Sequence, residues 1–563
     1  MIYHCEDHTC NYWDEGEKLP ERCPQCGRKL LRANEADMTG DDWTALGNTL
    51  WDAEASDKKR MVDCFRKAAY LGSAWGVCNL GICMEQGNGV EADPVQAFWL
   101  YQQAVEMGSL NAVCCLGVCY QYGIGTAPDA KQAAELYCKA AEYGSPRGQM
   151  LLARAFHDGI GVEADAAEAV HWVRAAAYQR YGEGMYRLGV CYEYGDGVEQ
   201  NWEHAVHWFR EAAESGVSAA MTDLGYCYEK GCGVEQSWEQ AFSWYRRGAE
   251  CGNPVSMSNL GLCYKRGYGV EQNWQEAVKW YEQGAQCGHL QSMNNLAYCY
   301  EYGEGVEQNE ERALYWYRRG AEAGSDYCMY CLGWNYSNGE GVEQNMTEAI
   351  RWYTAAAEGG NADAMHNLGW HYDHGEGVEQ DMKKAICWYE RAAEQNHPAA
   401  MNSLGECYAM GRGVPRDLET AMEWYRRAAE LGEAMADYNM GWHLEQAGKL
   451  SEAYAHYRKA ADGNDDSAWW ALGRFYENGV VVAQDGKEAR RCYETGEKLG
   501  SVKCKMRLAR CKLLGIGGRR AKKAGLDLCR QALELAKESS EKEDYGYEAE
   551  MNLLRRTIAE NES

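Results

Sequence analysis

The hydrophobic positions of this chain recur with a fixed period over most of its length. A leucine followed by glycine, or a close equivalent of that pair, returns every 36 residues. The regular series is Leu80, Leu116, Leu152, Leu188, Leu224, Leu260, Leu296, Leu332, Leu368, Leu404 and Met440. Leu46, Leu472 and Leu508 extend it with spacings of 34, 32 and 36 residues, which gives 14 anchors. A fixed period of this length is typical of a solenoid of stacked repeats.

Each period predicts two helices joined by a glycine-containing loop. Ala220, Leu224 and Tyr228 share one face of a first helix, and Trp244 and Tyr245 lie on the apolar face of a second. Glycines are positioned to end the first helix, and an Asn, Asp or Ser to cap the second. A tryptophan recurs on the second helix, which we interpret as packing between helices. This tryptophan row is Trp172, Trp208, Trp244, Trp280, Trp316, Trp352, Trp388 and Trp424.

The pattern LG-x-C-Y…G-x-GVEQ(N/D)…A…WY…AAE-x-G resembles the Sel-one-like repeat, a member of the tetratricopeptide superfamily, over residues 40–525. The resemblance implies antiparallel helix pairs whose first helices line a concave groove, and the role of an adaptor or scaffold. We therefore predict an all-α fold, a right-handed α/α superhelical solenoid of about 14 helix-pair repeats with a 36-residue period, preceded by a small zinc ribbon.

Three domains follow from this pattern. They are a zinc ribbon at 1–36, the repeat solenoid at 37–525 and C-terminal capping helices at 526–563. The unit from Met440 to Leu472 departs from the regular pattern, because its loop is shorter and closer to that of an ordinary tetratricopeptide repeat.

The resemblance also implies where a partner binds: the two residues before each Leu-Gly pair and the one after it face the groove. An Asn directly before the pair can hydrogen-bond a peptide backbone, or it can bridge to the adjacent repeat. Exposed Tyr and Trp supply binding energy, unless curvature buries them between repeats. The predicted groove residues are Tyr226, Asn259, Asn295, Tyr298, Tyr330, Trp334, His366, Asn367, Trp370, Asn439 and Trp442.

Four cysteines near the N-terminus have the spacing C-x4-C-x12-C-x2-C, with a second half that reads CPQCG. Four thiolates can complete a tetrahedral site, so we predict a structural Zn²⁺ ion in a module similar to a zinc ribbon or a rubredoxin-type knuckle pair. The first gap is unusually long, and His4 or His8 could substitute for a thiol. The predicted ligands are Cys5, Cys10, Cys23 and Cys26.

Charge and composition limit the classes of partner that this protein can bind. The net charge of −28 favours solubility and repels nucleic acid and anionic membranes. The N-terminus is acidic and no run of about 18 apolar residues occurs, so we expect a cytoplasmic protein without a membrane partner. The segment 487–530 is the exception, with 14 Lys and Arg against 4 Asp and Glu. It is either a solvated face or a dock for an acidic partner or RNA.

Our leading hypothesis is therefore a non-enzymatic adaptor that holds a protein or peptide in its groove. The alternative is an RNA- or ribosome-associated regulator that uses the ribbon and the basic segment. A hydrolase of the β-lactam-binding type, a role known in cysteine-rich relatives, ranks last because their paired cysteines are absent here. His366, His371, Asp373 and His374 form the best local candidate for chemistry, but His371 replaces a recurrent cysteine and is better explained by packing.

Overall fold

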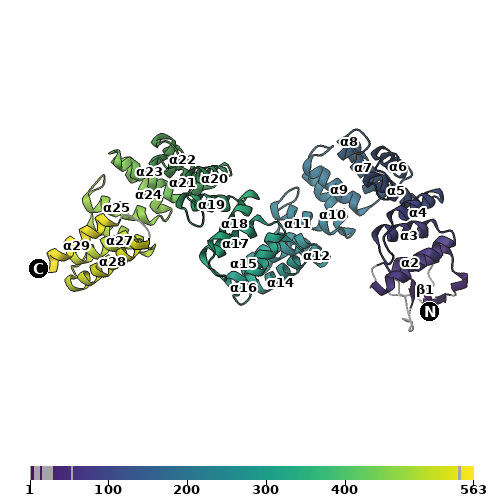
Figure 1. Cartoon of the computed structure of the whole chain (residues 1–563), viewed down its shortest axis with the longest axis horizontal. Helices are drawn as coiled ribbons and strands as arrows, with labels where there is room; N and C mark the ends of the chain where they lie inside the picture. Colours follow the sequence, from purple (N-terminus) through teal and green to yellow (C-terminus); the bar gives the residue numbers. More distant parts are fainter. Residues whose placement is uncertain are drawn as a thin grey trace. The chain divides into compact units, whose positions relative to one another are not determined.

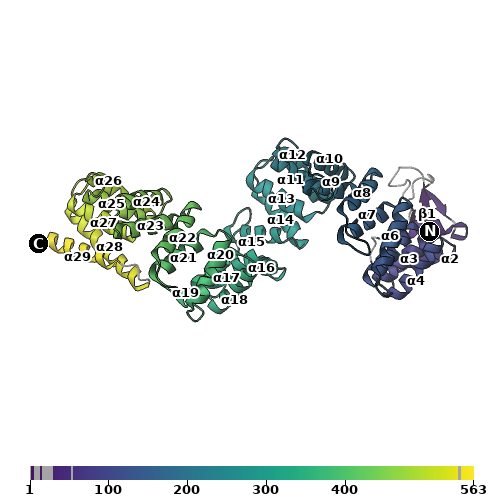
Figure 2. The same cartoon turned by 90° about the horizontal axis from the view of Figure 1, so that it is seen from above.

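The computed structural model describes residues 2–5, 13–15, 30–33, 35–51, 55–542 and 547–562 of the chain. They fall into two compact units, one of Met1–Ser292 with Glu304–Val306 and the other of Met293–Gly303 with Glu307–Ser563. Within each unit, successive helices lie side by side in chain order, as Figure 1 and the perpendicular view in Figure 2 show. The described part of the chain contains no helix long and apolar enough to cross a membrane.

The first unit begins with a small antiparallel sheet. Its strands have the order β2-β1-β3, with Ile2 opposite Glu15 on one side and opposite Ala33 on the other. The strands are β1 (Ile2–Cys5), β2 (Trp13–Glu15) and β3 (Leu30–Ala33), followed by the 3-10 helix η1 (Glu35–Asp37).

Helices make up the rest of this unit. They are α1 (Gly40–Thr49), α2 (Ala55–Tyr70), α3 (Ala74–Gln86), α4 (Pro94–Glu106), α5 (Leu110–Tyr122), α6 (Ala130–Glu142), α7 (Pro146–Asp158), α8 (Ala166–Tyr178), α9 (Gly182–Tyr194), α10 (Trp202–Glu214), α11 (Ser218–Lys230), α12 (Trp238–Glu250), α13 (Pro254–Arg266) and α14 (Trp274–Gln286). The next helix, α15 (Leu290–Tyr302), contains residues of both units.

The second unit continues the same alternation of helices. They are α16 (Glu310–Glu322), α17 (Asp326–Asn338), α18 (Met346–Glu358), α19 (Ala362–His374), α20 (Met382–Glu394), α21 (Pro398–Met410), α22 (Leu418–Glu430), α23 (Ala434–Gln446), α24 (Leu450–Asp462), α25 (Asp466–Asn478), α26 (Gly486–Lys498), α27 (Val502–Leu514), α28 (Lys522–Lys542) and α29 (Glu548–Glu562). Every predicted anchor leucine or methionine lies on an odd-numbered helix, so the odd helices α1 to α27 are the first helices of the pairs.

The glycine of each Leu-Gly pair gives room to an aromatic ring from the second helix. A Cβ atom built on Gly225 would lie 2.6 Å from Cε1 of Tyr245, so no larger residue fits there without movement. The Tyr245 hydroxyl donates to Oε2 of Glu229 at 2.8 Å, at the end of the same first helix. Ring and hydroxyl therefore fix both the distance between the paired helices and their axial offset.

This arrangement recurs along the chain and forms what we call the aromatic column. Its members are the largest fully buried side chains among the described residues. They are Phe65, Tyr101, Tyr137, Phe209, Tyr245, Tyr281, Tyr317, Tyr353, Tyr389, Tyr425, Tyr457 and Tyr493.

The loop after most first helices is fixed by contacts at the same positions of each repeat, as the loop after α11 shows. Gly231 ends α11 in the left-handed region with φ 75°. Nε2 of Gln236 then donates to the carbonyl of Glu229, seven residues earlier, at 2.8 Å. Gly233, with φ 68°, lies against the backbone of Trp202 in the preceding pair, where a Cβ atom would come within 2.4 Å. The loop thus sets the spacing to the previous repeat as well as the turn between helices.

The tryptophan row packs at the edge of the same helices. Trp244 and Trp316 are buried, and the other members are half-buried. Arg247 covers the outer ring face of Trp244, with its guanidinium 4.2 Å from the ring centroid. This placement agrees with the predicted packing role.

The unit with the shortened loop keeps the defining contact of the column. Tyr457 on α24 donates to Oε2 of Glu445 on α23 at 2.7 Å, across 12 residues instead of the usual 16. The buried ring still covers Gly441, where a Cβ atom would lie 2.8 Å from it. Loss of four loop residues therefore leaves the pair geometry unchanged.

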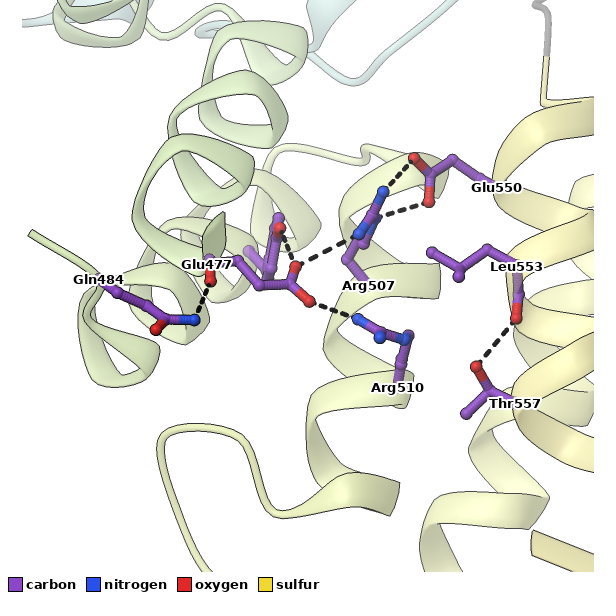
Figure 3. A network of polar contacts seen from close by, with 8 residues as sticks. Glu477, Gln484, Arg507, Arg510, Glu550, Leu553 and Thr557 are labelled. Atoms are coloured by element: carbon purple, nitrogen blue, oxygen red, sulfur yellow. Dashed lines mark hydrogen bonds and ion pairs between the residues drawn. The ribbon is translucent and has the colours of Figure 1, made fainter. Parts of the chain in front are cut away.

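A buried ion-pair network holds the last helices together (Figure 3). Glu477 on α25 accepts hydrogen bonds from Tyr493 at 2.8 Å, from Arg507 at 3.3 Å and from Arg510. Arg507 on α27 also makes a two-pronged contact with Glu550 on α29, at 2.6 and 2.8 Å. Breaking a pair of this kind leaves an uncompensated buried charge, so the network fixes α29 against α27.

We predict that the ring and the hydroxyl of the column contribute separately to stability. Tyr245→Phe should lower the free energy of unfolding by about 1 kcal/mol, because it removes only the bond to Glu229. Tyr245→Ala should lower it by about 3–5 kcal/mol, because it also leaves a cavity. Urea unfolding followed by circular dichroism measures both, and Tyr143→Ala, at an exposed ring, is the control. Equal effects of the two Tyr245 variants would contradict this account.

Candidate partner-binding face

The residue directly after each Leu-Gly pair points away from the column, and several of these side chains are large and exposed. In the first unit, Tyr226 is 43% exposed. In the second, Trp334, Trp370 and Trp442 are 45%, 37% and 40% exposed, whereas Tyr298 is half-buried. We call these five residues the aromatic row. Within the second unit, rings of this size at equivalent positions of several repeats are apolar surface that a folded monomer rarely leaves open.

Side chains one helical turn later support the rings of the row. Trp370 stacks on His374, with centroids 4.3 Å apart and planes 24° apart, and Nδ1 of His374 lies 2.9 Å from the Trp370 carbonyl oxygen. Tyr298 lies 4.6 Å from Tyr302 in the same i, i+4 relation. Such pairs restrict the rotamers of the rings, which reduces the entropy that a partner must overcome on binding.

One of the predicted asparagines before the pair forms a hydrogen-bonded bridge to the preceding repeat. Nδ2 of Asn439 donates to Oδ1 of Asn402 at 3.0 Å and to Oε1 of Glu406 at 3.2 Å. Asn367 lies beside Tyr330 of the preceding repeat, where it opposes the rise that burial causes in the pKa of that hydroxyl. Asn259 and Asn295 are half-buried in the same position. Of the two roles that the sequence left open, the structure shows the bridge for Asn439.

This bridge belongs to a ladder that the sequence interpretation missed. A residue two before one pair contacts the residue just before the next pair, 37 positions later. Two of these pairs are hydrogen-bonded, His366 with Ser403 and Asn402 with Asn439. Tyr186 with Asp223 and Tyr330 with Asn367 are further pairs at this spacing, and in each the second residue affects the pKa of the tyrosine. The signal in the sequence is that both positions are polar in adjacent repeats. The ladder ties first helices together on the face that carries the aromatic row.

His366 occupies a desolvated position in this ladder. Its ring stacks on His397 at 5.2 Å and lies 5.7 Å from Tyr389 of the column, and its Nε2 is 3.4 Å from the Ser403 hydroxyl. Burial, together with the charge of His397, lowers the pKa of His366 to about 4. His366 is therefore neutral at pH 7 and offers a partner an uncharged ring.

A carboxylate interrupts the row between Trp370 and Trp442. Glu406 takes the position after the pair, where burial raises its pKa and the amides of Asn402 and Asn439 partly offset that effect. Nη2 of Arg412 lies 3.8 Å from Glu406, and Nη1 donates to the buried Asp373 at 2.9 Å. Arg412 thus links two acids of adjacent first helices, a contact that no spacing in the sequence announces.

The residues of the His366–His374 cluster on α19 have separate partners. His371 is buried with Nδ1 3.1 Å from the Glu376 carbonyl oxygen, while His374 stacks on Trp370. Asp373 is bound to Arg412. The described side chains include no group of three or more His, Cys, Asp or Glu placed to hold a metal ion.

The structure does not describe the side chains of the predicted zinc ligands. Cys10, Cys23, Cys26 and His8 lie outside the described residues, as do the side chains of His4 and Cys5. The basic segment 487–530 is described, and several of its charges face acids. Arg507 and Arg510 belong to the network of Figure 3.

The chain matches one family model. The Sel1 repeat model matches twelve segments, at 76–109, 112–145, 146–181, 182–217, 218–253, 254–289, 290–325, 326–361, 362–397, 398–433, 434–465 and 468–501. None of the curated protein sequences is significantly similar to this chain.

Two solved structures are similar to this chain. The chain is similar to c5321, a protective antigen of uropathogenic Escherichia coli with an SLR fold, at 29% identity over 76% of this chain and 94% of that one, with a TM-score of 0.57. A Sel1 repeat protein from Oxalobacter formigenes shares 28% identity over 56% of this chain and 94% of its own, with a TM-score of 0.46.

The environment of His366 predicts a pH dependence of stability. Because its pKa is about 4 in the folded chain and 6.5 when unperturbed, the unfolded state binds the extra proton between these values. Stability should fall as the pH drops from 6.5 to 4, by up to about 3 kcal/mol from this group. His366→Tyr, which copies Tyr330 in the preceding repeat, should reduce that loss in melts followed by circular dichroism. His207→Gln, at an exposed position, should not, and an unchanged pH profile in His366→Tyr would refute the assignment.

Proposed function

The chain belongs to the Sel1 repeat family, and we propose that it is a non-enzymatic scaffold that binds a peptide or protein partner across the first-helix face of its second unit. Sel1 repeat proteins are in general protein-interaction scaffolds, which supports the class of function. The position of the site is our inference from the side chains on that face.

The observation that carries the proposal is the exposure of three tryptophans at one repeat position within one unit. Trp334, Trp370 and Trp442 each leave more than a third of the side chain open to solvent. Tryptophan is enriched among the residues that dominate binding energy, since it combines a large apolar area with a polar N–H group. Their alignment on first helices favours a partner that runs across several repeats.

Polar groups beside the aromatic row favour recognition of the main chain of a bound peptide. The half-buried Asn439 has its amide oriented by the N–H bonds to Asn402 and Glu406, and its carbonyl oxygen can accept a hydrogen bond from a partner. Asn367 offers the same amide two repeats earlier in the unit. Neutral His366 adds a ring nitrogen without adding charge. An extended peptide, which presents donors and acceptors at regular intervals, suits such a surface.

We also propose a structural zinc site in the N-terminal module. In the three-stranded sheet the end of β1 lies beside the starts of β2 and β3, because His4 is opposite Trp13 and Cys5 is opposite Leu30. In sequence, Cys10 precedes β2 by three residues and Cys26 precedes β3 by four. These separations are compatible with four thiolates at one end of the sheet, with the metal holding a module too small for a core of its own.

We place the scaffold in the cytoplasm. The 22 cysteines of residues 55–542 are all free thiols, many of them buried among apolar side chains. Unpaired thiols in this number suit a reducing compartment.

If the partner binds the first-helix face, which we call the groove assignment, substitutions on that face should weaken binding selectively. Partners captured from an extract of the source organism by the wild-type chain should bind Trp334→Ala/Trp370→Ala/Trp442→Ala at least tenfold more weakly, because each truncation removes hot-spot area. The matched control is Trp99→Ala/Tyr143→Ala/Tyr315→Ala, which removes three exposed rings that lie on second helices or their ends. Quantitative mass spectrometry of the captured proteins measures both. Equal loss in the two triple variants, or no loss in either, would disprove the assignment.

The zinc proposal predicts a metal content. The purified chain should hold about one zinc ion, measured by elemental analysis, and Cys23→Ser/Cys26→Ser should hold none. Cys251→Ser, at an exposed free thiol, is the control and should keep the ion. If Cys5→Ser retains zinc while His4→Gln loses it, a histidine takes the place of that thiol. A wild-type chain that binds no zinc would end the proposal.

A further inference from the structure

One position breaks the aromatic column. The second helix α8 carries Val173 where the other pairs between α1 and α26 carry a buried Phe or Tyr. The facing first helix α7 carries Ala153 where most of its neighbours have the glycine that accommodates the ring. The exchange of Tyr for Val removes most of an aromatic ring from the space between α7, α8 and α9.

A cavity of about 630 Å³ occupies this place. Its lining can be compared with the surroundings of Tyr353, a regular member of the column. The Tyr353 ring covers Gly333 and lies 6.1 Å from Tyr330 on its own first helix and 5.6 Å from His371 on the next one. The residues at the three equivalent positions around Val173 all line the cavity; they are Ala153, Met150 and Cys191. The cavity is therefore the vacated ring site, enlarged towards solvent.

The polar end of the vacated site differs from that of a regular repeat. In a regular repeat an acid accepts the hydrogen bond of the tyrosyl hydroxyl, as Glu229 does for Tyr245. His157 occupies the equivalent position here. Nδ1 of His157 lies 2.7 Å from Asp158 and Nε2 lies 3.2 Å from Asp196, and these carboxylates raise its pKa. With both ring nitrogens turned to acids, His157 orients two carboxylates at the edge of the cavity.

The cavity lies in the first unit and opens on the first-helix face of its own repeats. Arg154 and Val190, which follow the Leu-Ala pair of α7 and the Leu-Gly pair of α9, line its mouth and occupy the repeat position of the aromatic row. Arg154 and Arg187 are paired with Asp158 at 3.3 Å and Glu183 at 2.9 Å. The floor, formed by Ala153, Val170 and Val173, is apolar and buried.

We propose that this cavity binds the side chain of a tyrosine supplied by a protein partner. The fold itself shows what fits, since ten of its twelve column rings are tyrosines in the equivalent position. The hydroxyl of an inserted ring would donate to Asp158 or Asp196, as the Tyr245 hydroxyl donates to Glu229. A volume of about 630 Å³ is within the range of ligand sites and leaves room for the partner's main chain at the mouth. This proposal rests on the proposed scaffold function in one respect, namely that the tyrosine belongs to a protein partner.

The test uses p-cresol, the isolated side chain of tyrosine, with the full-length chain. Saturation-transfer NMR and calorimetry should show saturable binding at one site, and toluene, which lacks the hydroxyl, should bind at least about threefold more weakly because the acids lose their donor. Ala153→Gly/Val173→Tyr rebuilds the regular pair and fills the cavity, so it should raise the melting temperature and abolish the binding. Ala153→Gly alone leaves the cavity open and should keep the binding.

A second filled variant guards against misfolding. Ala153→Gly/Val173→Phe copies Gly189 with Phe209 in the next pair, and it should also lose p-cresol while keeping wild-type helicity. Absence of saturable binding to the wild-type chain, or equal binding to the folded filled variants, would overturn the proposal. Because p-cresol needs no partner, its binding should survive Trp334→Ala/Trp370→Ala/Trp442→Ala. Failure of the groove assignment is thereby separated from failure of the cavity.

Discussion

A tyrosine ring placed on a glycine, with its hydroxyl on an acid of the same helix pair, is the contact on which the rest of this structure depends. It explains why glycine follows the anchor leucine, because the ring fills the space that a side chain would need at Gly225. The paired helices are fixed in distance by the ring and in offset by the bond to Glu229. The loop after the first helix can then reach the previous repeat, where Gly233 lies against the backbone at Trp202. Pair geometry and stacking geometry are therefore set by neighbouring residues of one short motif.

This division of labour leaves the opposite side of the first helix free for other uses. Positions such as Trp334 and Trp370 carry no part of the column, and along the chain this position holds Asn, Ile, Val, Arg, Tyr, Leu, Trp or Glu. The ladder, three and four positions earlier, limits that freedom, because His366 and Asn439 are already hydrogen-bonded to a neighbouring repeat. Variation is thus tolerated where the repeat does not need the side chain, and this is where a scaffold acquires its selectivity.

Much of the fold was predictable from the sequence, because the same hydrophobic and capping pattern recurs from repeat to repeat and each copy supports the others. The anchor leucines, the helix boundaries and the caps at residues such as Ser237 and Asn273 follow from periodicity and local hydrogen bonding. The role of Gly225 could not be predicted from the sequence, because it depends on the position of the Tyr245 ring, which lies 20 residues later on another helix. The capping helices were expected from 526 onwards, whereas α28 begins at Lys522. Their ion pairs join residues far apart in sequence, and no local pattern encodes such an orientation.

The shortened loop of the α23–α24 pair shows what kinds of change the gene can accept. Tyr457 reaches Glu445 across 12 residues as well as Tyr245 reaches Glu229 across 16, so twelve nucleotides can be lost from this loop without disturbing the ring or its hydrogen bond. Elsewhere this loop is the part that contacts the previous repeat, as at Gly233, so a deletion there acts on the contact between neighbours while each pair remains intact. A lineage that carries this architecture can therefore adjust the path of its binding face through loop length, without replacing any residue that contacts a partner.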